Sequence, residues 1–177
     1  MIHLRKAIFL DRDGVINQSI IRNGKPYPPA SLADLKIIDG VPEALKKLHA
    51  AHFLLLVVTN QPDVARGTTK MAAVEEINHC LQQNLVLDEV FVCYHDDKDQ
   101  CICRKPLPGL LLQAAAKYKI NLAESFMIGD RWKDIDAGKN AGCKTIWIDM
   151  GYDEKIPSSA DFIAKSLKEA ANWILKK

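Results

Sequence analysis

The chain has 177 residues, enough for one compact domain with a substantial core, and we expect residues 1–177 to form a single domain. Hydrophobic residues make up 48% and charged residues 26%, which argues against a disordered chain. The formal net charge is only +2, so the overall charge indicates no nucleic-acid or membrane partner. An anionic substrate would have to be held by local charges.

The apolar stretches of the chain, such as 53–58, are strand-sized and too short to span a bilayer. Asp11 comes too early for a secretory apolar region to precede it. Together these two observations predict a cytoplasmic protein.

Strand-like and helix-like runs alternate along the chain. Nearly continuous apolar segments predict five buried strands, at Ala7–Leu10, Phe53–Thr59, Glu89–Tyr94, Ser125–Gly129 and Lys144–Asp149. Helical spacing and first-turn prolines predict helices at Pro42–Ala51, Lys70–Asn84, Pro108–Lys117, Asp134–Ala141 and Ser166–Lys176. This alternation favours right-handed crossovers and a central parallel sheet, which is an α/β fold.

The segment Ile16–Ile37 carries Gly24 and three prolines, and we expect an ordered loop beside the first strand. It is too short to be a large cap domain, so the cleft should be open. The loop either serves as a simple connector or, because it follows Asp13 closely, faces the substrate.

Two carboxylates, Asp11 and Asp13, follow the first predicted strand in the sequence Asp11-Arg12-Asp13-Gly14. Ligands of open α/β sheets bind beyond the carboxyl ends of the strands, where such a pair suits a nucleophile and its acid/base partner. By itself the pair is more typical of a turn or a helix cap than of a catalytic site, because Asp caps free backbone donors.

Further polar groups recur at the ends of later elements. They are Thr59-Asn60-Gln61, Arg104-Lys105 and Gly129-Asp130-Arg131, with Asp134 one turn later. A hydroxyl and a lysine can stabilise phosphate oxygens, and carboxylates can hold magnesium. Each group taken singly could be an ordinary turn, a solvated lysine or a helix cap. Their common position at strand ends favours a phosphoryl-transfer site.

In these motifs the chain resembles the haloacid dehalogenase-like phosphohydrolases over most of its length. The resemblance implies a Rossmann-like three-layer sandwich and a Mg²⁺-dependent reaction through an aspartyl-phosphate. It also implies that Asp11 is the nucleophile, Asp13 the general acid/base, and Thr59 and Lys105 the phosphate clamps. The implied magnesium ligands are Asp11, Asp130 and the backbone carbonyl of Asp13, with Asp134 behind them or capping the next helix.

Three cysteines and a histidine lie close together in the pattern Cys93-x-His95 and Cys101-x-Cys103. Four such ligands match a closed tetrahedral Zn²⁺ site of the structural kind, which leaves no open position for catalysis. We expect this zinc to fold the loop and to fix where Arg104 and Lys105 point. Unrelated free cysteines are the alternative interpretation.

The zinc loop narrows the resemblance to a branch of the family that hydrolyses sugar bisphosphates or histidinol phosphate. Arginines grip phosphate but repel an ammonium group, so Arg66 and Arg104 favour a heptose 1,7-bisphosphate cleaved at its 7-phosphate, in nucleotide-heptose and lipopolysaccharide synthesis. The expected substrate contacts are Asn60, Gln61, Arg66, Arg104 and Arg131. Pro62-Asp63 and Arg131 depart from the residues common in that branch.

Two other classes of protein use similar residues. A phospho-accepting receiver domain also combines aspartates, a hydroxyl, a lysine and magnesium, but the second carboxylate, Asp13, would hydrolyse its phosphoenzyme. A zinc-braced binding module without catalysis would not need every catalytic position filled. We therefore expect an enzyme that acts on a small sugar phosphate, and the resemblance favours a monomer.

Overall fold

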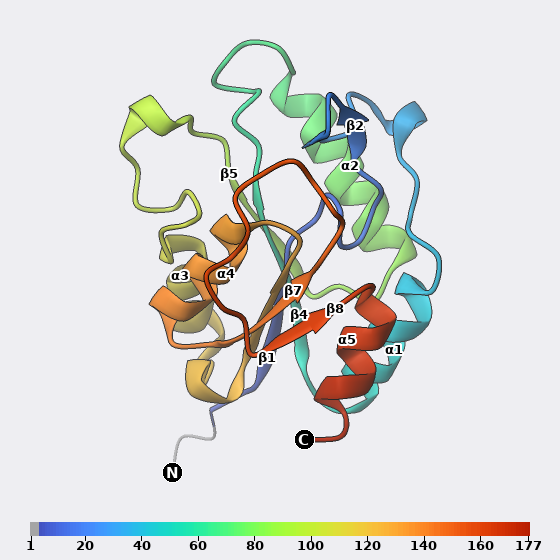
Figure 1. Ribbon diagram of the computed structural model, residues 1–177, viewed down its shortest axis with the longest axis vertical. Helices are drawn as coiled ribbons and strands as arrows, with labels where there is room; N and C mark the ends of the chain where they lie inside the picture. The colour runs from blue at the N-terminus through green and yellow to red at the C-terminus, as the bar shows by residue number, and fades with distance from the viewer. Residues whose placement is uncertain (1–3) are drawn as a thin grey trace.

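The computed structural model describes residues 4–177, whose main sheet has six strands in the order β5-β4-β1-β6-β7-β8 (Figure 1). All five pairings in this sheet are parallel. The strands are β1 (Ala7–Leu10), β4 (Leu54–Asn60), β5 (Glu89–Cys93), β6 (Phe126–Gly129), β7 (Lys144–Ile148) and β8 (Phe162–Ala164). Because β1 pairs with β4 on one side and β6 on the other, the chain reverses its direction of travel across the sheet at β1.

Helices cover both faces of the sheet, which confirms the expected three-layer α/β sandwich. On one face lie α1 (Val41–Ala50), α2 (Met71–Asn84) and α5 (Leu167–Ile174), and on the other α3 (Gly109–Tyr118) and α4 (Trp132–Ala141). Side chains alternate along β1: Ile8 and Leu10 pack into the first core, Ala7 and Phe9 into the second. None of the helices in the described part of the chain is long and apolar enough to cross a membrane.

Every predicted strand and helix is present, with ends that differ by two residues or fewer. The fourth helix begins at Trp132 and not at Asp134, and the last ends at Ile174. Strand β8 was not predicted, because its three residues are too few to show a pattern.

The segment Ile16–Ile37 is more structured than the expected loop. It contains an antiparallel hairpin of β2 (Ile20–Arg22) and β3 (Lys25–Tyr27), followed by the short 3₁₀ helix η1 (Leu32–Asp34). The hairpin turns at Asn23 and Gly24, whose φ angles of 50° and 73° suit the Asn-Gly pair. Its tip contacts the loop after β7, where the Asp153 amide donates to the Gly24 carbonyl at 3.0 Å.

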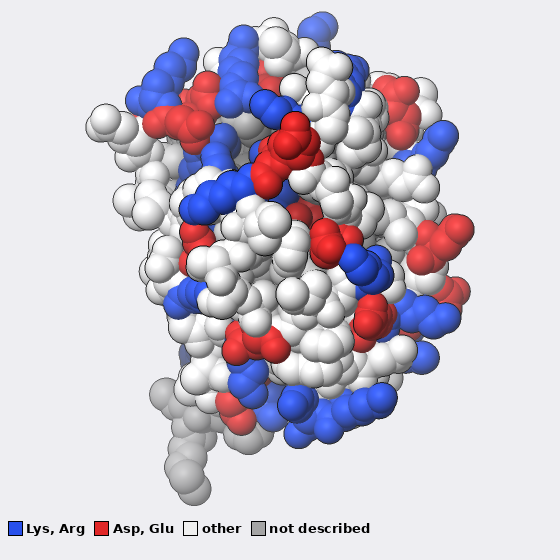
Figure 2. Space-filling view, viewed as in Figure 1, with Lys and Arg blue, Asp and Glu red and all other residues white. Residues whose placement is uncertain are grey.

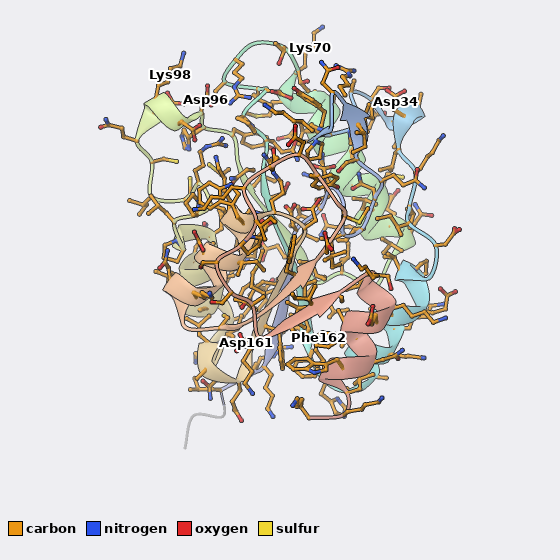
Figure 3. All side chains as sticks on the ribbon, viewed as in Figure 1. Asp34, Lys70, Asp96, Lys98, Asp161 and Phe162 are labelled. Atoms are coloured by element: carbon orange, nitrogen blue, oxygen red, sulfur yellow. The ribbon has the colours of Figure 1, made fainter. Side chains whose placement is uncertain are left out.

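The strands point with their carboxyl ends toward the upper end of the molecule in Figure 1. Asp161 and Phe162, at the amino end of β8, lie at the lower end, whereas Asp96 and Lys98, in the loop after β5, lie at the upper end (Figure 3). Crevices at such ends, next to the strand where the order reverses, are where open α/β sheets bind ligands. The fold therefore directs attention to the loops that follow β1, β4, β5 and β6.

Candidate active site

A cavity of about 230 Å³ opens where these loops meet. Of the predicted site residues, Asp11, Asp13, Asn60, Arg66, Lys105 and Arg131 line it. The remaining lining includes hairpin residues Lys25–Pro28, Lys133, Asp134 and Glu154. Basic and acidic side chains are interspersed over this upper half of the surface (Figure 2). The cavity is therefore polar, with both signs of charge at its wall.

Lys105 forms the centre of the buried part of the site. Its Nζ donates to Asp11 Oδ1 at 2.8 Å, to Asp134 Oδ1 at 2.6 Å and to the Val58 carbonyl at 2.8 Å. The Asn60 side chain fixes the same residue by its backbone, donating to the Lys105 carbonyl and accepting from its amide. Lys105 thus joins the ends of β1, β4 and α4 at one point, as the sequence predicts.

Asp134 caps the following helix, which is one of the two alternatives predicted for it, and it also contacts Lys105. One oxygen accepts from Lys105, and the other accepts from the Arg131 amide at 3.0 Å, which caps the start of α4. Both of its oxygens therefore already have donors within the protein.

Asp130 is the residue that lacks donors. It is 3% exposed, and neither carboxylate oxygen has a hydrogen-bond partner among the described residues. Asp11, Asp130 and Asp134 can bring one oxygen each within 4.8 Å of one another, against the single ammonium of Lys105. Oxygen donors with excess negative charge are what Mg²⁺ prefers, so the donor set fits a magnesium ion held by Asp11 and Asp130.

The pKa values of the buried carboxyl groups also indicate that the site lacks a second positive charge. Burial, opposed by Lys105, raises the pKa of Asp11 to about 6, and the nearby Asp134 and Asp13 add to the rise. Burial also raises the pKa of Asp130 well above its usual range, with Asp11 and Asp134 contributing. The pKa of Lys105 is raised despite burial because Asp11 and Asp134 face it. Lys105 therefore stays charged, while the carboxylates lack a second cation.

Asp13 lies at the cavity wall with both oxygens occupied. Arg12 donates to Oδ1 and Oδ2 at 3.1 Å each, Asn17 to Oδ1 at 2.9 Å and Gln61 to Oδ2 at 2.8 Å. Gln61 also donates to the Thr59 hydroxyl at 2.9 Å. Thr59 and Gln61, predicted as a phosphate clamp and a substrate contact, are 1% and 2% exposed and lie behind the cavity wall.

The three predicted substrate arginines each have an acidic partner. Arg66 donates to Asp96 at 2.6 and 3.0 Å, and Arg131 donates to Glu154 at 2.5 and 2.8 Å. Arg104 donates to Asp97 at 2.7 Å and is not part of the cavity lining. Their guanidinium groups are held in place by carboxylates, mostly of the loop after β5.

The four predicted zinc ligands come together as the sequence indicates. Cys103 Sγ lies 3.2 Å from Cys93 Sγ and 3.4 Å from Cys101 Sγ, and 3.3 Å from His95 Nδ1. A tetrahedral zinc with bonds of about 2.3 Å sets its sulfurs about 3.8 Å apart, close to this spacing. The cysteines are free thiols, so the cluster could hold a metal ion.

Some residues that shape the site were not among the predicted site residues. A Cβ on Gly14 would lie 1.9 Å from Asp130 Oδ2 and 2.9 Å from the Tyr152 hydroxyl, so glycine is required for both groups to approach. Gly14 belongs to the motif Asp11-Arg12-Asp13-Gly14, whereas Tyr152 and Glu154 lie in a loop without periodicity. Lys133 follows Arg131 closely but has no motif of its own.

Comparison with known proteins identifies the class. The HAD-hydrolase-like family model matches residues 102–170. A Helicobacter pylori protein is 38% identical over 98% of this chain and 99% of its own length. The chain belongs to the haloacid dehalogenase-like family, and it is a phosphoric monoester hydrolase.

The relatives and a solved structure carry a narrower name. The H. pylori protein is named D-glycero-beta-D-manno-heptose-1,7-bisphosphate 7-phosphatase. A Thermosynechococcus vestitus protein, 34% identical over 96% of this chain and 95% of its own, is named D-glycero-D-manno-heptose-1,7-bisphosphate 7-phosphatase. The B. bronchiseptica heptose 1,7-bisphosphate phosphatase, crystallised with magnesium and phosphate, is similar with a TM-score of 0.82 and 30% identity over 97% of this chain and 98% of its own.

Proposed function

We propose that this hydrolase removes the 7-phosphate of D-glycero-D-manno-heptose 1,7-bisphosphate. The observation that carries the proposal is the meeting of Asp11, Asp13 and Lys105 at one charged cavity, with Asp130 buried beside them. The names of relatives that match nearly the whole chain support the substrate. The main six-stranded sheet, whose strands come from residues 7 to 164, supports one domain.

The proposed reaction has two steps on the protein's own groups. Lys105 holds Asp11 Oδ1, and an Asp11 oxygen attacks phosphorus while the ester bond breaks and the leaving oxygen takes a proton from Asp13. Water then attacks the phosphorus of the aspartyl-phosphate, giving its proton to Asp13 as the bond to Asp11 breaks. Phosphate leaves, and Asp11 and Asp13 regain their starting states.

Two metals are proposed. Asp11, Asp130 and the Asp13 backbone carbonyl would hold Mg²⁺, which supplies positive charge that offsets repulsion between carboxylates and phosphate. Cys93, His95, Cys101 and Cys103 would hold a structural Zn²⁺ that fixes the loop carrying Asp96 and Asp97. Through these two carboxylates the zinc loop would also position Arg66 and Arg104.

The substrate's second phosphate would be bound at the arginine side of the cavity. Arg66 and Arg131 line it, and each presents its guanidinium to a carboxylate that a phosphate can replace as acceptor. Asn60 would contact substrate while fixing Lys105.

One assay tests the proposal. The magnesium-loaded protein is incubated with heptose 1,7-bisphosphate, histidinol phosphate or 4-nitrophenyl phosphate, released phosphate is measured, and ³¹P NMR identifies which phosphate leaves. We expect fastest turnover of the bisphosphate, at its 7-position. Faster turnover of histidinol phosphate would overturn the substrate. A phosphorylated protein that releases no phosphate would instead indicate a receiver domain.

A further inference from the structure

Arg12 is the largest fully buried side chain among residues 4–177, with 0% exposure. Arginines are seldom buried completely, because removing a guanidinium from water is costly unless its charge and its N–H groups find partners. Arg12 takes no part in either step of the proposed reaction. Its position between the two proposed reacting carboxylates, Asp11 and Asp13, calls for a physical explanation.

The guanidinium makes a two-point contact with Asp13. Arg12 Nε donates to Oδ1 and Nη2 to Oδ2, each at 3.1 Å. Parallel bonds from a planar fork fix the plane of a carboxylate as well as its distance. Lys105 at the other end of the site holds Asp11 by a single bond, so the orientation of Asp13 is more tightly defined.

The other end of the same guanidinium is tied to a helix. Arg12 Nη1 donates to Asn78 Oδ1 at 2.8 Å across 66 positions of sequence. Asn78 is 6% exposed in the middle of α2, next to Ile77 in the hydrophobic core. The other donors to Asp13, Asn17 and Gln61, come from loops that follow strands, whereas Asn78 anchors Arg12 to a packed helix.

We infer that Asn78 and Arg12 are positioning residues for proton transfer by Asp13. Asn78 fixes the guanidinium, and the guanidinium fixes the plane of the Asp13 carboxyl group. The proton takes the place of one of the two amide donors, Asn17 or Gln61, and the fixed carboxyl group presents it to the leaving oxygen of the substrate. This inference rests on the proposed function, because it assumes that Asp13 donates the proton. Neither side chain lines the cavity, so neither touches the substrate.

The inference predicts a dependence on the leaving group. An alkoxide must be protonated as the ester bond breaks, whereas 4-nitrophenolate leaves without a proton. The ratio kcat/KM reports the steps up to that bond cleavage. A loosely held Asp13 therefore lowers kcat/KM for a sugar phosphate much more than for 4-nitrophenyl phosphate.

Asn78→Leu tests this, with Asn84→Leu as the matched control. Both substitutions remove an asparagine of α2, but Asn84 is exposed and bonds only within its own helix. We expect Asn78→Leu to lower kcat/KM for the heptose bisphosphate by about 10-fold and for 4-nitrophenyl phosphate by less than about 2-fold. Asn84→Leu should change neither.

A second variant keeps the inference testable if Asn78→Leu does not fold. Arg12→Lys keeps the charge but cannot form the planar fork, and it should show the same split between the two esters. Equal losses on both esters, or no loss, in folded variants would overturn the inference. A wild-type protein that hydrolyses neither ester would contradict the proposed function instead, and the two failures are thereby distinguished.

Discussion

Lys105 Nζ and Asp11 Oδ1 lie 2.8 Å apart, although the two residues are 94 positions apart in the chain. The same ammonium reaches Asp134, so one buried positive charge serves two carboxylates. This arrangement holds an Asp11 oxygen in place before any substrate binds. Replacing Lys105 should therefore affect the positions of both Asp11 and Asp134.

Lys105→Met should lower kcat by about 100-fold, because the variant loses the charge that holds Asp11 and that would stabilise the phosphate oxygens in the proposed reaction. Steady-state phosphate release measures the loss. Lys117→Met, which removes an exposed lysine paired with Glu89, is the control and should leave kcat unchanged. A Lys105 variant that keeps more than half of the wild-type kcat would show that the ammonium has no part in the reaction.

Gly14→Ala should weaken activation by Mg²⁺, because the added Cβ would lie 1.9 Å from Asp130 Oδ2 and displace that carboxylate. The measurement is the magnesium concentration needed for half-maximal activity. Gly142→Ala is the matched control: its φ of 86° resembles the 89° of Gly14, but no atom outside its own residue and its two chain neighbours lies within 4 Å of the added Cβ. Both variants should lose about 1–2 kcal/mol of stability from the left-handed backbone, and only the first should need more magnesium. Equal magnesium requirements would argue against Asp130 as a ligand.

Cys101→Ser should lose bound zinc and lower the thermal midpoint by more than about 5 °C, because a structural zinc site contributes folding free energy. Metal analysis and thermal unfolding check both effects. Cys80→Ser, a cysteine of α2 outside the cluster, should retain full zinc content. If Cys101→Ser keeps wild-type zinc content and stability, the proposed structural zinc site does not exist.

Arg66→Met should raise KM for heptose 1,7-bisphosphate by about 10-fold with little change in kcat, because a charge-assisted contact to the distal phosphate is lost. The comparison substrate is heptose 7-phosphate, which lacks that second phosphate and should show an unchanged KM. Parallel rises in KM for both compounds would place Arg66 at the reacting phosphate or in a purely structural role beside Asp96.

The core of the site could be predicted because parallel strands end at a common edge. That rule brings Asp11, Thr59 and Asp130 together from three strands, and short spacing does the same for Cys93 and Cys103. It could not show that the Thr59 hydroxyl accepts from Gln61 and is not part of the cavity lining, or that Arg104 donates to Asp97 and is not part of it either. Those details depend on side-chain conformations that spacing does not encode.

Other residues of the site were not predicted from the sequence, for a different reason. Asn78 lies at a core-facing position of α2, between Ile77 and Leu81 of the buried stripe, but only the fold shows that Arg12 meets it there. The β2–β3 hairpin had a local signal in Asn23-Gly24, but the nearby prolines and the short strands favoured a loop. Tyr152 and Glu154 reach the site from a segment of no regular structure.

The contact between the hairpin tip and the loop after β7 uses main-chain atoms, the Asp153 amide and the Gly24 carbonyl. A bond between main-chain atoms does not depend on most of the side chains around it. Lys25 and Glu154, beside the contact, can therefore be exchanged by mutation or by design while the two segments stay attached. The cavity wall is thus free to diverge toward new sugars or other phosphate esters, while the residues that break the phosphate ester bond stay the same.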